Sequence, residues 1–396
     1  MPDIFQKCFD YDRADAILEA GLYPYFRTIT QNDGPEVIMN GKRTIMIGSN
    51  NYLGLSMDER VMEAAKQAVD KYGTSCSGSR YLNGTTDLHQ QLEEEIADFM
   101  GKEKAFCVTT GYMTNLGAIS ALAGRGDVLI VDKTNHASLV DGQLNAFGAV
   151  IKRYEHNDME DLERILSSIP DSKSKMIVTD GVFSVEGNLV NLPEMVKLAK
   201  QYNARIYLDD AHGCGVVGKT GRGTAEHYDL MDDVDLVMTT FSKSFASIGG
   251  FVAGDAKVID YIRHNARPIM FGASMSPPAV AAALTALRII RKEPEKIEKL
   301  NANADYVRDN LKAMGYDTGH SETPIIPIVT YDEMNTLQFA KKLADNGIFT
   351  NPFIPPGVPE GRSMIRTSYM ATHTKDMLDY VLEQFQLLGK EYGIIS

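Results

Sequence analysis

Short apolar runs alternate with segments of helical periodicity through the middle of the chain, and this alternation restricts the fold more than any other feature. The runs lie at residues 105–109, 128–131, 176–178, 206–208 and 236–239. Runs of this length without polar alternation are typical of parallel strands that are buried on both faces. Before the first of these runs, the apolar residues within 88–99 lie on one face of a predicted helix, and Gly101 follows as a stop signal. Strands that alternate with helices predict an α/β fold with a mostly parallel sheet.

The pattern changes after about residue 290. Strands are predicted at 325–330 and 364–368, separated by a helix that ends near Gly347. A last helix has one apolar face over 377–388. This part of the chain is expected to form a smaller α+β domain.

A chain of 396 residues is too long for one small core. We expect an N-terminal segment at 1–50, a large domain at 51–290 and a C-terminal small domain at 291–396. The prolines within 352–359 exclude regular helix and central strand. They fit a rigid connection and a wall over the site equally well.

The net charge of −13 argues against nucleic acid or an anionic membrane as a partner, because both need basic surface. No run approaches the roughly 18 apolar residues of a transmembrane segment, and the N-terminus lacks the pattern of a signal peptide. The four cysteines have no paired spacing, so neither a disulfide framework nor a metal site is expected. These features predict a cytoplasmic protein.

Polar residues gather directly after the predicted strands. They are found at 110–112, 135–136, 184, 209–212 and 242–243. Ligands of an open α/β sheet bind at the carboxyl ends of its strands. We therefore expect these residues to meet at one site.

Asp209 and Lys243 have the chemistry of a cofactor site. Asp209 ends a predicted strand, where a carboxylate can hold a protonated pyridine nitrogen, although a turn or helix-capping Asp is the commoner case. Lys243 is flanked by Ser242 and Ser244, and glycines at 249–250 permit close backbone approach. An amine in such a pocket can form a Schiff base, whereas most lysines are solvated surface charges. Ser242 would offer its hydroxyl to a phosphate.

Three further features have weaker signals. The passage from strand to helix at 109–112 is a potential anion site, since free N–H groups and the helix dipole meet there. His136 can stack on a planar ring, but a lone His is more often structural. Arg366 lies in a predicted strand, where its guanidinium suits a substrate carboxylate or is simply a surface charge.

Four motifs, in type, order and spacing, make the chain resemble the α-oxoamine synthases from about Pro24 to the C-terminus. The motifs are Ser49-Asn50-Asn51-Tyr52-Leu53-Gly54-Leu55, then Gly78-Ser79-Arg80-Tyr81-Leu82-Asn83-Gly84-Thr85 with His89 behind it, Asp209-Asp210-Ala211-His212, and Thr240-Phe241-Ser242-Lys243-Ser244. The resemblance implies a fold-type I transferase that depends on pyridoxal 5′-phosphate (PLP).

The resemblance also implies roles for individual residues. Lys243 corresponds to the imine-forming lysine, Asp209 to the partner of the pyridinium, and His136 to the histidine that stacks on the ring. His212 and Ser184 correspond to groups near the ring oxygen. Gly111, Tyr112, Thr240 and Ser242 correspond to the phosphate cradle, and Asn50 and Arg366 to the holders of the amino-acid carboxylate. The implied catalytic set is Lys243, His136, Asp209 and His212.

Two positions depart from the family pattern. Asp210 stands where Glu is usual, which leaves Asp209 in place. Gly272 stands where the family has Ser or Thr, whose hydroxyl reaches the phosphate in the neighbouring subunit. Ser274 or a backbone N–H is the candidate replacement. The resemblance implies a homodimer with the active site at the interface.

The implied reaction is a decarboxylative condensation of an amino acid with an acyl-CoA, which yields a 3-oxo amine, CoA and CO2. The Lys243 motif and the stretches at 263–267 and 370–374 most resemble the branch of the family that uses serine and a long-chain acyl group, and this resemblance implies the same substrates here. The alternatives are a related synthase that uses glycine or alanine with a shorter acyl-CoA, a plain aminotransferase, and a non-catalytic partner subunit. Lys243 and Asp209 argue against the last, because such a subunit needs neither.

Overall fold

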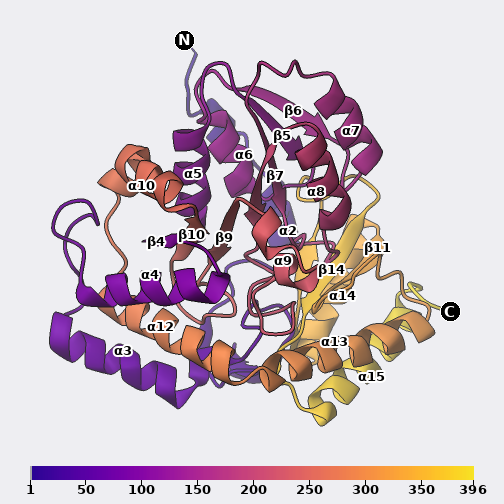
Figure 1. Ribbon diagram of the computed structural model, residues 1–396. Helices are drawn as coiled ribbons and strands as arrows, with labels where there is room; N and C mark the ends of the chain where they lie inside the picture. Colours follow the sequence, from indigo (N-terminus) through magenta and orange to yellow (C-terminus); the bar gives the residue numbers. More distant parts are fainter. Residues whose placement is uncertain (1) are drawn as a thin grey trace.

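The computed structural model describes residues 2–396 and contains a central sheet of seven strands (Figure 1). In spatial order the strands are β4 (Lys104–Val108), β10 (Gly250–Gly254), β9 (Leu236–Thr240), β8 (Arg205–Asp209), β7 (Lys175–Asp180), β5 (Val128–Asp132) and β6 (Val150–Tyr154). Neighbouring strands from β9 to β6 are parallel, while β10 is antiparallel to both of its neighbours. The predicted α/β class with a mostly parallel sheet is confirmed, and each of the five apolar runs is a strand.

Two strands of this sheet were not predicted. β6 lies at the sheet edge and is mostly exposed, so its residues Val150–Tyr154 lack a continuous apolar run. β10 begins and ends with glycine, a residue that weakens the strand pattern. Gly250 is required there, because a Cβ on it would lie 2.9 Å from the Cα of Gly111. This close approach brings the helix that starts at Gly111 against the sheet.

Helices cover both faces of the sheet, as buried parallel strands require. One face packs against α4 (Asp87–Met100), α7 (Met159–Ser167), α8 (Leu192–Gln201) and α12 (Pro277–Lys292). The other packs against α5 (Gly111–Leu122), α6 (Ala137–Leu144), α10 (Ala256–Asn265) and α11 (Arg267–Phe271). α3 (Glu59–Tyr72) lies along α12, outside the first layer (Figure 1).

The helix predicted over 88–99 is α4, and its ends have physical causes. Thr86 and His89 form a capping box at the N-terminus, so two free N–H groups are satisfied. Gly101 ends the helix in the left-handed conformation, at φ 61°. The apolar face of the helix, including Leu92 and Ile96, is fully buried in the core.

The C-terminal part has its own antiparallel sheet of β11 (Ile325–Tyr331), β14 (Ser363–Ser368) and β13 (Asn351–Phe353). It packs with α13 (Glu295–Ala313), α14 (Glu333–Asp345) and α15 (Lys375–Glu391), shown in orange and yellow in Figure 1. The predicted strands and the last helix are confirmed.

The N-terminal strands β1 (Ile29–Asn32), β2 (Glu36–Met39) and β3 (Lys42–Met46) form a third sheet with β12 (Ile348–Phe349). Before them, the short helices α1 (Gln6–Phe9) and α2 (Arg13–Glu19) bury no residue. The small helix α9 (Thr224–His227) comes after β8.

Within residues 2–396, no helix is both long enough and apolar enough to cross a membrane. The same residues contain no group of three His, Cys, Asp or Glu side chains arranged to hold a metal ion. All four cysteines are free.

Candidate active site

The carboxyl ends of the central strands border a cavity of about 320 Å³. It is lined by Thr110, Gly111, Tyr112, Asn115, His136, Ser138, Asp180, Asp209, Ala211, His212, Met238, Thr240, Ser242, Lys243, Ile248 and Gly249. The structure thus brings together all predicted site residues except Asn50, Ser184, Ser274 and Arg366. This clustering is a consequence of the topology, because parallel strands end at one edge of the sheet.

Lys243 lies in the tight connection between β9 and β10. The N–H of Phe241 donates to the carbonyl of Gly249 at 2.8 Å, so the connection is closed at its base. Burial of the amine lowers the pKa of Lys243 to about 8, against the opposing attraction of Asp209 and Asp180. A substantial fraction of this amine is therefore neutral near pH 7–8, where it can act as a nucleophile or a base.

Asp209 ends β8 with a carboxylate that is fixed on both oxygens. Oδ1 accepts the N–H of Ala211 at 3.0 Å, and Oδ2 accepts the side-chain amide of Asn115 at 2.6 Å. Burial and the neighbouring charge of Asp209 raise the pKa of Asp180 well above its ordinary range. Two adjacent carboxyl groups whose environments differ in this way put the negative charge of the cavity on Asp209.

Two histidines face the same cavity. Burial lowers the pKa of His136, whose Nδ1 lies 2.7 Å from the hydroxyl of Ser138. Burial and the nearby Lys243 lower the pKa of His212 well below its usual value, so its ring is neutral. The Tyr52 hydroxyl lies 2.7 Å from His212 Nδ1, and burial raises the pKa of Tyr52 to about 12. Where the Tyr52 phenol donates to Nδ1, Nε2 carries the proton of the neutral His212 ring.

An anion site lies at the other end of the cavity, at the N-terminus of α5. The Thr110 hydroxyl caps the helix by accepting the N–H of Met113 at 3.1 Å. The N–H groups of Gly111 and Tyr112 precede it at the open end. The hydroxyl oxygens of Thr240 and Ser242 lie 2.8 Å apart, and Thr240 Oγ1 also donates to the carbonyl of Gly249 at 3.0 Å. The weak sequence signal at 109–112 therefore coincides with free N–H groups at the start of a helix, beside two hydroxyl groups.

Lys243 and Ser242 also line a second, larger cavity of about 870 Å³. Asn50 belongs to this cavity, and its Oδ1 accepts a hydrogen bond from Arg366 Nη2 at 2.9 Å. Arg366 Nε donates to the carbonyl oxygen of Ser184 at 2.6 Å. The structure therefore joins Asn50, Ser184 and Arg366 to one another beside the first cavity.

Ser274 lines neither cavity and, unlike Ser184 and Arg366, forms no hydrogen bond with another predicted residue within residues 2–396. Its N–H donates to the carbonyl of Gly78 at 2.9 Å. Its hydroxyl oxygen is buried, and no protein group within residues 2–396 forms a hydrogen bond with it. Within one chain, Ser274 does not reach the site.

Three residues of the site were missed in the sequence analysis. Asn115 lies one helical turn beyond Gly111 and faces the same way, a spacing that could have identified it. Asp180 ends β7 as Asp209 ends β8, so the strand-end rule applies to it equally. Tyr52 belongs to a quoted motif, but its pairing with His212 joins segments far apart in the chain and left no local signal.

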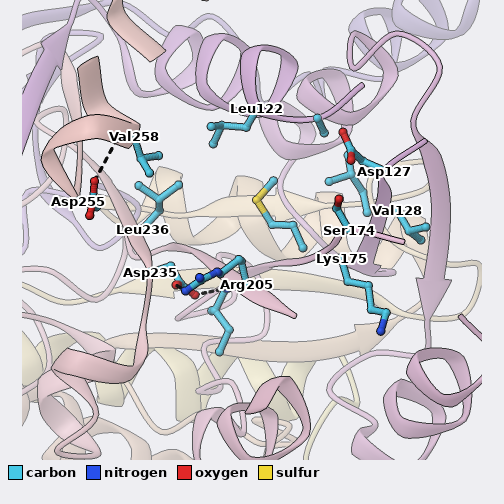
Figure 2. A pocket seen from close by; sticks show the side chains of 14 residues that line it. Leu122, Asp127, Val128, Ser174, Lys175, Arg205, Asp235, Leu236, Asp255 and Val258 are labelled. Atoms are coloured by element: carbon cyan, nitrogen blue, oxygen red, sulfur yellow. Dashed lines mark hydrogen bonds and ion pairs between the residues drawn. The ribbon is translucent and has the colours of Figure 1, made fainter. Parts of the chain in front are cut away.

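A different cavity, of about 460 Å³, lies at the amino ends of the same strands (Figure 2). Its charged side chains are paired with other protein groups. Figure 2 shows Arg205 joined to Asp235, at 2.6 Å, and Asp255 facing the N–H of Val258. Lys175 donates to the carbonyl of Tyr202 at 2.8 Å. These charged side chains of the cavity therefore already have partners within the protein.

The fold and the site define a class of protein that the comparisons confirm. The family model described as aminotransferase class I and II matches residues 42–385, and the chain belongs to this family. The chain is 50% identical over 391 residues to serine palmitoyltransferase of Sphingobacterium spiritivorum, covering 99% of this chain and 98% of the relative. It is 40% identical over 397 residues to 8-amino-7-oxononanoate synthase of Thermoanaerobacter pseudethanolicus, covering all of both chains. A high-resolution structure of serine palmitoyltransferase (SPT) with a PLP internal aldimine superposes on this chain with a TM-score of 0.96, at 37% identity over the full length of both chains. The resemblance to α-oxoamine synthases is confirmed.

Proposed function

We propose that this chain condenses L-serine with a long-chain acyl-CoA in a PLP-dependent reaction that releases CoA and CO2 and leaves a 3-oxo amine, as in the first step of sphingolipid synthesis. The observation that most supports this proposal is the position of Lys243. It lines both cavities and so lies between the carboxylate of Asp209 and the Asn50–Arg366 pair. The higher identity to serine palmitoyltransferase than to 8-amino-7-oxononanoate synthase supports serine and a long acyl chain.

The residues of the smaller cavity fit PLP. Its volume of about 320 Å³ suits a single substituted ring. The N–H groups at the start of α5, with Thr240 and Ser242, would hold the phosphate. Asp209 would hold the pyridinium nitrogen, His136 would lie against the ring, and the N–H of His212 would meet the ring oxygen. PLP supplies an electron sink that stabilises negative charge at the amino acid's α-carbon.

The residues of the larger cavity would hold the amino acid. The guanidinium of Arg366 is fixed by Ser184 and Asn50, so it presents a directed pair of donors to a carboxylate. A fixed carboxylate sets which bond of the α-carbon lies perpendicular to the ring plane. The same binding of the carboxylate by Arg366 would orient the α-carbon first for loss of its proton and later for loss of CO2.

Lys243 Nζ would accept the α-proton. Its pKa of about 8 lets the neutral amine take up a proton near physiological pH and return it later in the cycle. Burial and the nearby Arg366 lower the pKa of this amine, whereas the charges of Asp209 and Asp180 raise it. These groups together balance Lys243 between its two protonation states.

We further propose a homodimer with two shared sites, in the cytoplasm. Large apolar side chains remain exposed around the site, among them Tyr81, Leu82, Ile248 and Phe271, and a two-fold interface would bury them. Four free cysteines are consistent with a reducing compartment. Sedimentation equilibrium of the holoenzyme tests the dimer, and a monomer at micromolar concentration would contradict it.

The experiment that tests the function is thiol release from a panel of acyl-CoAs, crossed with glycine, alanine and serine. We expect the highest rate with L-serine and a long acyl chain, and equal amounts of CoA and CO2. Preference for alanine and a short dicarboxylic acyl group would instead assign the chain to the oxononanoate branch. Keto-acid turnover without CoA release would show an aminotransferase, and a chain with no visible absorbance lost on borohydride treatment would be a non-catalytic subunit.

A further inference from the structure

The turn at residues 183–189, which we call the Ser184 turn, carries the carbonyl that fixes Arg366. It comes after β7 and closes on itself, since the N–H of Phe183 donates to the carbonyl of Asn188 at 3.1 Å and the N–H of Gly187 to that of Phe183 at 2.9 Å. Arg366 Nε donates to the Ser184 carbonyl at 2.6 Å. Any shift of the Ser184 turn therefore moves an acceptor on which the direction of the Arg366 guanidinium depends.

The large domain holds the Ser184 turn through His156. The side-chain amide of Asn188 donates to His156 Nε2 at 3.3 Å, and the Phe183 ring lies edge-on to the imidazole with centroids 4.3 Å apart. On its other side, His156 Nδ1 lies 3.2 Å from Asp132 Oδ1. Burial alone would lower the pKa of His156, but the hydrogen bond and charge of Asp132, with Glu186 nearby, raise it above its ordinary value.

Asp132 is itself fixed, so it can direct His156. Its side chain is fully buried and also accepts the backbone N–H groups of Thr134 and Asn157, both at 2.8 Å. Asn157 adopts φ 53° and donates from its side chain to the carbonyl of Leu189 at 3.0 Å, at the far end of the Ser184 turn. The end of β5 thus holds the turn at two points.

The small domain holds the same turn from the opposite side. The carbonyl of Gly187 accepts the N–H of Glu322 at 3.1 Å and the hydroxyl of Thr323 at 2.9 Å. Gly187 has φ 71°, and a Cβ there would collide with the carbonyl of Ile325. Ile325 pairs with Ser368 on β14, the strand that also carries Arg366. The Ser184 turn therefore contacts both the side chain of Arg366 and the strand that pairs with β14.

We propose that His156 and Asn188 are positioning residues that hold the Ser184 turn so that Arg366 is directed at a free carboxylate. The inference rests on the role proposed for Arg366 in binding the amino acid. Neither residue lines a cavity at the site, and each acts through the Ser184 carbonyl. By fixing the Ser184 turn, these two residues give the site its preference for amino acids over amines that lack a carboxylate.

The test compares ligands that differ only at the carboxylate. L-serine and L-serine methyl ester are titrated into the holoenzyme without acyl-CoA, and visible absorbance reports binding of each. The variants are Asn188→Ala, which removes the link to the turn, and His156→Phe, which keeps a ring against Phe183 but removes both nitrogens. The control is His227→Phe, because His227 likewise lies edge-on to an aromatic ring, that of Tyr228, but forms no hydrogen bond with residues 183–189.

We expect both variants to bind L-serine about tenfold more weakly, the scale of one hydrogen bond in a charged pair, and the ester within about twofold of the wild type. The control should change neither. Equal weakening of acid and ester, or no change in either, overturns the inference, as does a wild type that binds both ligands equally. Because no acyl-CoA is present, these outcomes are independent of whether the condensation itself occurs.

Discussion

The two ends of the central sheet each have a cavity lined by charged groups, yet only one of them is equipped for chemistry. At the amino ends, Arg205 is paired with Asp235 and Lys175 with a backbone carbonyl. At the carboxyl ends, Lys243 has no fixed partner of this kind, and its pKa is lowered to about 8. A buried charge that is paired stabilises the fold, whereas one kept near neutrality by its surroundings is available to react.

The difference arises from the residues at the two ends of each strand rather than from the strand interiors. The carboxyl ends of β7 and β8 place Asp180 and Asp209 side by side, and burial together with the charge of Asp209 raises the pKa of Asp180. At the amino ends, Arg205 is paired with Asp235 (Figure 2), and Lys175 lies against the carbonyl of Tyr202 and, at 3.5 Å, the carboxylate of Asp171. Cavity size alone does not distinguish them, because the amino-end cavity is the larger of these two.

Two buried lysines give the strongest contrast between the ends. Lys243→Ala should abolish multiple turnover with the fold retained, because the amine serves chemistry. The side chain of Lys175 is only 1% exposed. The variant Lys175→Met should keep activity within about twofold but lose roughly 1–3 kcal/mol of unfolding free energy, because it removes the buried hydrogen bond to the Tyr202 carbonyl. Steady-state turnover and urea unfolding measure both. More than a trace of turnover in Lys243→Ala would refute its assignment.

Two aspartates give the next contrast. Asp209→Asn should still bind PLP but lose about 10²- to 10³-fold in the rate of deuterium exchange at the amino acid's α-carbon, since a preorganised charge is removed. Asp235→Asn retains an oxygen acceptor for Arg205 and should exchange at the wild-type rate. Proton NMR of the amino acid in D2O reports the exchange. An unchanged rate in Asp209→Asn would contradict the role proposed for it.

The lowered pKa of Lys243 predicts a pH dependence in the protein without PLP. The amine reacts only when neutral, so its rate of acylation should rise about tenfold per pH unit below pH 8 and level off above it. An ordinary lysine would continue to gain reactivity to about pH 10.4. Mass spectrometry of the peptide that contains Lys243 gives the rate at each pH. A midpoint near 10 would show that burial does not tune this amine.

Gly272 should give the smallest effect, and the structure decides its direction. A Cβ there would lie 2.5 Å from both the Pro268 carbonyl oxygen and Met113 Cε. Met113 can move, but the carbonyl belongs to the backbone of α11. Gly272→Ser should therefore lose roughly 1–3 kcal/mol of unfolding free energy through overpacking, without slowing loss of PLP. Slower PLP dissociation at matched dimer concentration would show that the added hydroxyl reaches a phosphate after all.

The sequence predicts the site well where reactive residues come directly after a strand. Asp209, His136 and Lys243 each lie at or just after a strand end, and a single rule about parallel sheets brings them together. The same rule applied to β7 would have identified Asp180. Hydrophobic periodicity likewise located α4 and α15, because their buried stripes are continuous.

Other features could not be read from local patterns. The pairing of Tyr52 with His212 and the hold of Ser184 on Arg366 join residues far apart in the chain, so only the tertiary fold reveals them. β10 was missed because glycines begin and end it, and the first of them, Gly250, serves close packing against α5 rather than strand formation. Its antiparallel direction in a parallel sheet has no sequence signature.

The reversed strand β10 sets the earliest point in synthesis at which the connection that carries Lys243 can be anchored on both sides. β10 pairs with β4, which emerges from the ribosome far earlier, and with β9 just before it. Until Gly250–Gly254 has been translated, β4 and β9 each present an open edge, and the connection that carries Lys243 lacks its second anchor. A nascent chain that stops short of Gly250 therefore contains Lys243 but lacks the strand that anchors the connection around it. Binding of PLP would report that β10 has paired with β4 and β9.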